Sequence, residues 1–501
     1  MKTYAPYRIL YCLLCLMLAC SCHEDVHRVS VIMHPPAITP DYSGTVLPPN
    51  IAPANFRILE DGRRFTVRII GDEGDPIVIR SKHPDIRIPE KQWKALLQAN
   101  RGRDIRADIL VLNDSTYYRY ASIINHIAEE EIDRYLAYRL IEPSYVNYSI
   151  LGIYQRCLEN FDVRAIYTTD RQDDLRNKHC INCHTFKQHG TADMMFHVRG
   201  AHGGTLFIHD GRIEKINTQT DSTLSACVYP SYHPTRNKIA FSVNETRQTF
   251  HSANLQKVEV VDFASDLVLY DVDQHTIRPV LRNTPQMETF PTWAPDGKSL
   301  YFCSATCPIP DSTDYQDYLA LHNEDIHYDL MRIAYDPDTD TFGKVDTVLV
   351  MSDKHSSIAF PRISPDGRHM LLCISDYGNF VTWHKSSDLY MLDLETGALE
   401  KLIQVNSDES EGFHNWSANG RWFVFSTRRD DGNYTRPYFA YFGTDGKVSK
   451  PFPLPQRDPM HSVRLMKSYN LPELTDEPVR FSRRTFDDVI MGDAGQAVYK
   501  P

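Results

Sequence analysis

The pentapeptide Cys180-Ile-Asn-Cys183-His184 is the segment whose residue types and spacing could do chemistry. In a helix, positions i, i+3 and i+4 share one face, so two thiols and one imidazole would point the same way. Two such thiols can form thioethers with the vinyl groups of one porphyrin while the imidazole binds its iron. C-x-x-C-H is the pattern of c-type haem attachment. The sequence therefore predicts one covalent haem c on Cys180 and Cys183, with His184 as the proximal iron ligand.

Candidate residues for the sixth iron position follow the motif directly. Met194, Met195 and His197 come next in the chain. A methionine thioether would raise the iron potential relative to a second imidazole. Packing in a hydrophobic core explains either methionine equally well. We treat all three as candidate distal ligands, with the two methionines placed before the histidine.

A zinc ion is the alternative occupant of the motif. Zinc would need two further ligands, typically a second C-x-x-C or a pair of histidines. After the N-terminal segment the chain has no second C-x-x-C, and the nearby donors are histidines: His179, His189, His197 and His202. The motif alone leaves both metals open.

The N-terminus predicts export. Lys2 and Arg8 precede an apolar run over residues 9–20, which is too short to cross a bilayer and typical of a secretory signal. The run ends in Cys20-Ser21-Cys22, which resembles the cleavage point of a bacterial lipoprotein signal; an ordinary cleaved signal peptide is the alternative. We expect a signal peptide over residues 1–22, lipidation at Cys22 or alternatively Cys20, and a lipid-anchored protein in the periplasm or at the outer membrane. In the c-type cytochrome family haem is attached outside the cytoplasm, so export favours haem c over zinc.

Length and composition set the fold class. The chain has 501 residues, which predicts more than one domain, and it is rich in Tyr (28) and Phe (22), residues that favour strands. Its net charge of −11 argues against nucleic acid as a partner. Residues 23–55 are rich in Pro and Ser and predict an extended tether. Alternating apolar residues over 56–143 predict a small β-sandwich-like domain with one helical window at 90–99, and residues 144–202 would carry the haem.

The second half of the chain repeats. Four segments, starting at Tyr229, Phe290, Phe360 and Phe413, share an aromatic residue followed by Pro or His, then a turn and an apolar strand. Asp-Gly or Asn-Gly turns at Gly297, Gly367 and Gly420 require positive φ and predict β-hairpins.

These segments resemble the PD40, or TolB-like, β-propeller repeat. The resemblance implies a mainly β fold with a propeller of six blades over residues 203–480, followed by a C-terminal tail at 481–501. With the haem motif and the export signal, most of the chain resembles a Bacteroidetes group of lipoproteins that carry one haem motif before a propeller. That group implies electron transfer or haem-dependent redox sensing with a redox partner protein.

No hydrolase motif accompanies the propeller. The sequence has no G-x-S-x-G, and the segment after the fourth repeat is too short for a hydrolase domain. Two functions therefore stay open. The first is an electron-carrying haem lipoprotein whose propeller docks a redox partner. The second is a propeller that binds a protein or glycan and whose C-x-x-C-H site is structural, with haem or zinc.

Overall fold

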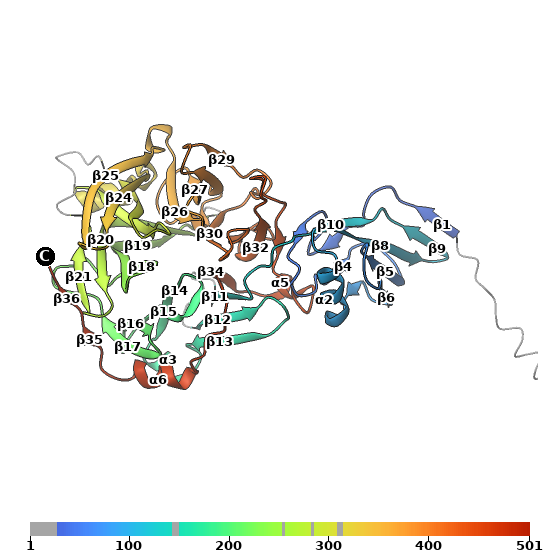
Figure 1. Cartoon of the computed structure of the whole chain (residues 1–501), viewed down its shortest axis with the longest axis horizontal. Helices are drawn as coiled ribbons and strands as arrows, with labels where there is room; N and C mark the ends of the chain where they lie inside the picture. Colours follow the sequence, from blue (N-terminus) through green and yellow to red (C-terminus); the bar gives the residue numbers. More distant parts are fainter. Residues whose placement is uncertain (1–27, 143–149, 253–255, 282–284, 308–313) are drawn as a thin grey trace, which may run out of the picture.

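The computed structural model describes residues 28–142, 150–252, 256–281, 285–307 and 314–501. It shows a small β-domain beside a ring of sheets (Figure 1). The predicted signal peptide, with Cys20 and Cys22, lies outside the described residues. Within the described ranges no helix is long and apolar enough to cross a membrane.

The N-terminal domain packs two sheets and one helix. Its larger sheet has the order β1-β9-β8-β10-β3, with β5 joining β8 to β6, and its smaller sheet has the order β2-β4-β7. The strands are β1 (Arg28–Val31), β2 (Ile38–Thr39), β3 (Val46–Leu47), β4 (Phe56–Ile58), β5 (Arg64–Ile70), β6 (Ile77–Ser81), β7 (Asp85–Ile86), β8 (Asp104–Asn113), β9 (Thr116–Arg119) and β10 (Ile123–Ile127). The predicted helical window is confirmed as α2 (Glu90–Ala99), which buries Trp93 and Leu97.

The predicted tether is wrong for its described part. Residues 28–55 belong to the N-terminal domain, because β1 and β3 pair with the larger sheet and β2 pairs with the smaller one. Tyr42, Leu47 and Ile51 are buried in the core of this domain. The prolines between these apolar residues keep the chain extended along the sheet, so composition alone made it look like a linker.

The propeller contains six sheets in the described part of the chain, which confirms the predicted mainly β fold. Blades one to three are β11 (Tyr135–Ile141), β12 (Leu151–Cys157) and β13 (Val163–Thr168) with β34 (Ser468–Thr475); β14 (Cys180–Lys187), β15 (Gly190–Arg199), β16 (Gly204–His209) and β17 (Arg212–Asn217); β18 (Val228–Tyr232), β19 (Lys238–Phe250), β20 (Val258–Asp271) and β21 (Thr276–Pro279). Blades four to six are β22 (Met287–Trp293), β23 (Ser299–Ala305), β24 (Asp329–Asp336) and β25 (Thr341–Leu349); β26 (Ser357–Ile363), β27 (His369–Ser375), β28 (Asp388–Asp393) and β29 (Leu399–Lys401); β30 (Glu411–Trp416), β31 (Trp422–Thr427), β32 (Arg436–Tyr441) and β33 (Phe452–Pro453).

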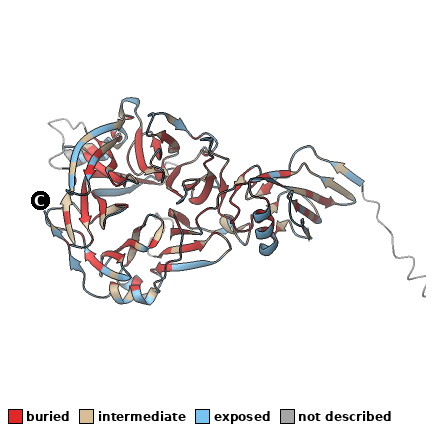
Figure 2. Cartoon of the chain, viewed as in Figure 1, coloured by how far each residue is buried: buried red, intermediate tan, exposed pale blue. Residues whose placement is uncertain are grey.

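The innermost strands close the ring. Each of β14, β18, β22, β26 and β30 contacts the innermost strand of the next blade, and β34 contacts both β30 and β14. Figure 2 shows buried residues along the strands of the blades and exposed residues on α2 and on the outer strand β25. The innermost strands therefore surround a central channel.

The propeller is longer at both ends than predicted. It starts at Tyr135 rather than at residue 203, so the predicted haem segment over 144–202 supplies strands of blades one and two. The predicted tail over 481–501 is folded: α6 (Arg483–Ile490) packs on blades one and two, and β35 (Gly495–Gln496) and β36 (Val498–Tyr499) extend blades two and three. Repeat spacing could not show this, because these additions pair with strands far away in the chain.

One hairpin extends beyond its blade. Residues 244–250 of β19 and 258–266 of β20 pair with each other after their neighbours β18 and β21 have ended. We call this extension the arm. Glu259 on the arm accepts a hydrogen bond from Tyr377 (2.9 Å) and lies 3.2 Å from Nε2 of His384. Asn379 donates to Asp262 (3.0 Å), so blade five fixes the arm across one end of the channel.

Candidate functional site

Each innermost strand carries the same irregularity. Its pairing skips two residues, and the first of the two has a positive φ between 42° and 53°. The six pairs are Cys183-His184, Tyr229-Pro230, Phe290-Pro291, Phe360-Pro361, Phe413-His414 and Leu471-Pro472. A bulge leaves the extra residue unpaired, so proline loses no ladder hydrogen bond there. The predicted repeat of an aromatic residue followed by Pro or His is this bulge.

The six bulges line one cavity. A bulge re-aims a side chain, and a positive φ at a non-glycine residue costs energy that tends to be kept at functional sites. The first residue of every bulge lines a cavity of about 430 Å³ at the centre of the ring. Tyr229, Phe290, Phe360 and Phe413 form a continuous crescent, with successive ring centroids 4.5, 4.4 and 4.7 Å apart. Cys183 and Leu471 leave a gap in this aromatic wall.

A second ring of side chains, two residues further along each strand, is polar. Its members also line the cavity: Thr185, Ser231, Thr292, Arg362, Asn415 and Glu473. Glu473 accepts hydrogen bonds from the Thr185 hydroxyl (3.1 Å) and the Phe186 backbone N–H (2.9 Å). The cavity therefore has an apolar layer and a hydrogen-bonding layer, as specific ligand sites do.

The predicted haem motif lies in β14 and not in a helix. Cys183 and His184 form the bulge of blade two, so His184 is the counterpart of His414 in blade six. Burial, followed by the positive charge of Arg139, lowers the pKa of His184 to about 3, so its imidazole is neutral at ordinary pH. Neither ring nitrogen of His184 has a hydrogen-bond partner among the residues that the structure describes.

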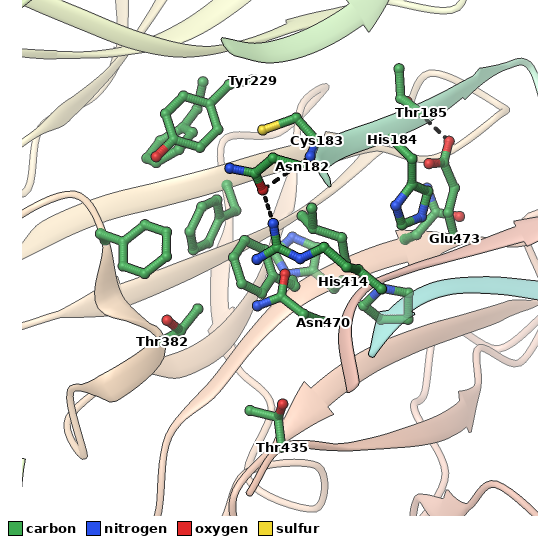
Figure 3. Close-up of a pocket in the computed structure, with 18 of the residues that line it drawn as sticks. Asn182, Cys183, His184, Thr185, Tyr229, Thr382, His414, Thr435, Asn470 and Glu473 are labelled. Carbon is green, nitrogen blue, oxygen red and sulfur yellow. Dashed lines mark hydrogen bonds between the residues drawn. The ribbon is translucent and has the colours of Figure 1, made fainter. Parts of the chain in front are cut away.

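The two thiols of the motif have different surroundings. Cys183 lines the channel, whereas Cys180 packs against the core between blades one and two, and both are free thiols. In Figure 3 the thiol of Cys183 points towards Tyr229, while the ring of His184 points in a different direction. A haem held by both thiols needs them to meet one porphyrin. The side chains in this conformation do not fit that arrangement, because the helix that would align them is absent.

The candidate distal ligands are separated from His184. Met194 is fully buried in the core between blades one and two, and Met195 is fully buried in the core between blades two and three. His197 is buried, and its Nδ1 lies 2.8 Å from the hydroxyl of Thr205. None of these three side chains lines the channel cavity. Packing accounts for both methionines.

The described part of the structure offers no cluster of zinc ligands. Across the described ranges, no group of three or more His, Cys, Asp and Glu side chains is arranged to hold a metal ion. His179 instead lies 3.1 Å from Asp174, and His189 lies 3.1 Å from the Leu474 carbonyl.

Arginines give the cavity its charge. Arg139, Arg199 and Arg362 line it, and none of the three forms an ion pair within the residues that the structure describes. Arg139 donates instead to Asn182 and to the Ile181 carbonyl, and its buried Nε has no partner in the described part of the chain. The acidic residue Glu142 at the rim is paired with Lys467 (3.7 Å). A protein with a net charge of −11 thus places unneutralised cations at its centre.

Glu473 is the one buried carboxyl of the polar ring. Burial raises its pKa from 4.5 to about 7, while the two hydrogen bonds and the charge of Arg362 act in the opposite direction. Below pH 7 the carboxyl is therefore neutral and the cavity has its full positive charge. Above pH 7 the carboxylate offsets Arg362.

The Glu473→Gln variant should be more stable than the wild type at pH 8. Since the pKa of Glu473 is higher in the folded protein than in the unfolded chain, wild-type stability falls as pH rises from 4.5 to about 7. Glutamine keeps the acceptor oxygen for Thr185 and Phe186 but cannot ionise. We expect a gain on the order of 1–3 kcal/mol at pH 8 and none at pH 4, measured by urea unfolding at both values. An equal effect at both pH values would contradict the assigned titration.

Comparison with known proteins shows little beyond the fold. No family model matches the chain. Over 168 residues, 33% of this chain, it is 29% identical to the uncharacterised protein Atu1656 of Agrobacterium fabrum, of which it covers 44%. Solved structures similar to it include the GH74 enzyme of Niastella koreensis (TM-score 0.34, 9% identity, 68% of this chain and 46% of that one). A second is the Synechocystis apocarotenoid oxygenase (TM-score 0.31, 11% identity, 84% and 93%). At these scores the likeness carries no argument about function, and the propeller rests on the strand pairing.

The sequence alone missed most of the channel residues. Arg139, Arg199 and Glu473 lie outside the four aligned repeats. Only the bulge on the innermost strand, which the structure shows, relates the blades that carry these residues to those repeats. The sequence did contain one indication of a further repeat: Leu471-Pro472 has proline at the same position as three of the aligned repeats. At Cys183-His184 the repeat has neither the aromatic residue nor the proline, so the haem pattern was the stronger one there.

Proposed function

We propose that this chain is a propeller-based binding protein whose small ligand occupies the central channel. The carrying observation is the ring of six bulges, in which every blade aims one side chain into the same cavity at an energetic cost. The cavity volume of about 430 Å³ lies in the range of small-molecule sites. Support comes from buried polar atoms that have no partner within the described ranges, namely Nε of Arg139, Oδ1 of Asn470 and the ring nitrogens of His184. Such atoms ordinarily find a partner.

A covalent haem is the second candidate function. It is favoured by the neutral imidazole of His184, because one of its two buried ring nitrogens carries a lone pair that could bind iron. Haem on Cys180, Cys183 and His184 would serve electron transfer or redox sensing with a partner protein. This proposal requires that β14 rearranges to bring Cys180 to the same side as Cys183. Lipid anchoring in the cell envelope, at Cys22 or Cys20, also stays a prediction.

Three variants of the motif separate the two functions. Cys183→Phe fills the gap in the aromatic crescent with a residue that three other blades already carry at this position. Cys183→Ser keeps the channel open but removes one of the two thioethers, and the double variant Cys180→Ser/Cys183→Ser removes both. For channel binding we expect a set of small acids and sugars to contain compounds that raise the melting temperature of wild type and Cys183→Ser, but not of Cys183→Phe.

The same proteins, exported from cells, are examined by a reduced-minus-oxidised absorption spectrum. A haem α-band that survives acid acetone in the wild type and is lost in Cys180→Ser/Cys183→Ser supports the haem. Its absence from the wild type contradicts the haem. If every stabilising compound acts equally on Cys183→Phe, the channel is not the binding site.

A further inference from the structure

We infer that the channel ligand is an acidic sugar, bound by its carboxylate, its ring face and its hydroxyl groups through three different parts of the wall. This inference rests on the proposed function and names the chemical class of the ligand. Each part of the wall is present in the structure independently of the other two.

The carboxylate is assigned to Arg139 and Arg199. Both residues line the cavity next to the gap at Cys183, since Arg139 donates to the neighbouring Asn182 and the charges of Arg139 and Arg199 both act on Tyr229, the first ring of the crescent. Neither forms an ion pair in the part of the chain that the structure describes. A guanidinium binds a carboxylate through two parallel hydrogen bonds, so a planar anion fits better here than a metal cation or a neutral group.

The ring face is assigned to the crescent. Tyr229, Phe290, Phe360 and Phe413 present a continuous aromatic surface that borders the cavity; the three phenylalanines are buried and Tyr229 is half-buried. The C–H groups on one face of a sugar ring are apolar and gain by leaving water against aromatic carbon. An inorganic anion would leave this aromatic surface without a contact. The ligand should therefore have an apolar face in addition to the anionic group that the arginines bind.

The hydroxyl groups are assigned to the polar ring. Ser231, Thr292 and Asn415 offer polar atoms to the cavity, each two residues after the first residue of its bulge. An aromatic acid has no hydroxyl groups to meet them. Unmet hydrogen-bonding groups in a closed site cost affinity, so the polar ring favours a hydroxylated ligand over a purely apolar acid.

The test uses the full exported chain and calorimetric titration at pH 6, where Glu473 is protonated. The probes are D-glucuronate, the neutral sugar D-glucose, the non-hydroxylated acid benzoate, and inorganic phosphate. We expect D-glucuronate to bind at least tenfold more tightly than each of the other three. Arg139→Met should weaken D-glucuronate binding by about tenfold to a hundredfold. Arg332→Met removes an arginine that is ion-paired with Asp346 outside the cavity and should change it less than twofold.

Phe360→Leu tests the ring face separately and should weaken D-glucuronate several-fold, with little change for phosphate. If D-glucose binds as tightly as D-glucuronate, or if Arg139→Met binds D-glucuronate as tightly as the wild type, the ligand does not need an acidic group. Equal binding of benzoate or phosphate overturns the sugar. Suppose that none of the four probes binds, but a neutral compound still raises the melting temperature of the wild type and not that of Cys183→Phe. This inference then fails, and the proposed channel site survives.

Discussion

Replacing Trp422 by alanine should lower the free energy of unfolding by about 3–5 kcal/mol. Trp422 is fully buried in a core that joins the N-terminal domain to blade six. Its indole Nε1 donates to the Glu130 carbonyl (3.2 Å), and its ring packs on Tyr441 with centroids 4.9 Å apart. Alanine would leave a cavity where the two domains meet, and the carbonyl would lose its donor. Urea unfolding followed by tryptophan fluorescence and circular dichroism measures the loss.

Two further substitutions serve as controls for the Trp422→Ala prediction. Trp422→Phe keeps a six-membered aromatic ring but loses the pyrrole ring with its N–H donor, so it should cost about 1–3 kcal/mol, less than alanine. Phe250→Ala removes an aromatic side chain that is 54% exposed on the arm and should cost less than 0.5 kcal/mol, roughly the range for surface substitutions. If Trp422→Ala unfolds at the same urea concentration as Phe250→Ala, the two domains do not share a core in solution.

Replacing Phe486 by alanine should destabilise the protein by about 3–5 kcal/mol. This residue lies in α6, in the segment that sequence analysis took for a tail, and its side chain is fully buried. Its ring packs edge-on against Phe196 of blade two and Tyr167 of blade one, with centroids 5.3 and 6.3 Å away. The expected loss is large because the cavity would open between two blades. It is measured as a shift of the urea midpoint.

The control for this prediction comes from the same segment. Met491 directly follows α6 and is 53% exposed, so Met491→Ala should leave the urea midpoint within error of the wild type. A Phe486→Ala midpoint equal to that of Met491→Ala would show that α6 does not hold blades one and two together.

Local patterns in the sequence predicted local structure well. Gly297, Gly367 and Gly420 have φ of 69°, 76° and 67°, as their turns require. β24 and β28 begin at Asp329 and Asp388, each directly before a run rich in apolar residues. These features are decided by neighbouring residues, because a two-residue turn or a strand start depends on backbone preference and on alternation within a few positions.

What the sequence could not predict depends on partners distant in the chain. Blade one pairs Tyr135 with Thr475, and no pattern within either strand indicates the other. The C-x-x-C-H string was interpreted through a helix, yet β14 is held as a strand by β15 and by the neighbouring innermost strands. Arg139 and Arg362 were missed for the same reason, since the cavity that they line exists only once the blades are in a ring.

Closure of the ring by β34 gives the protein an order of assembly. Arg139 on β11 is among the first propeller residues to be synthesised, whereas Asn470 and Glu473 on β34 are among the last. The cavity therefore cannot exist on a nascent chain, and a ligand cannot be captured until synthesis has passed Thr475. A chain exported in the unfolded state would reach its destination empty and acquire its ligand there.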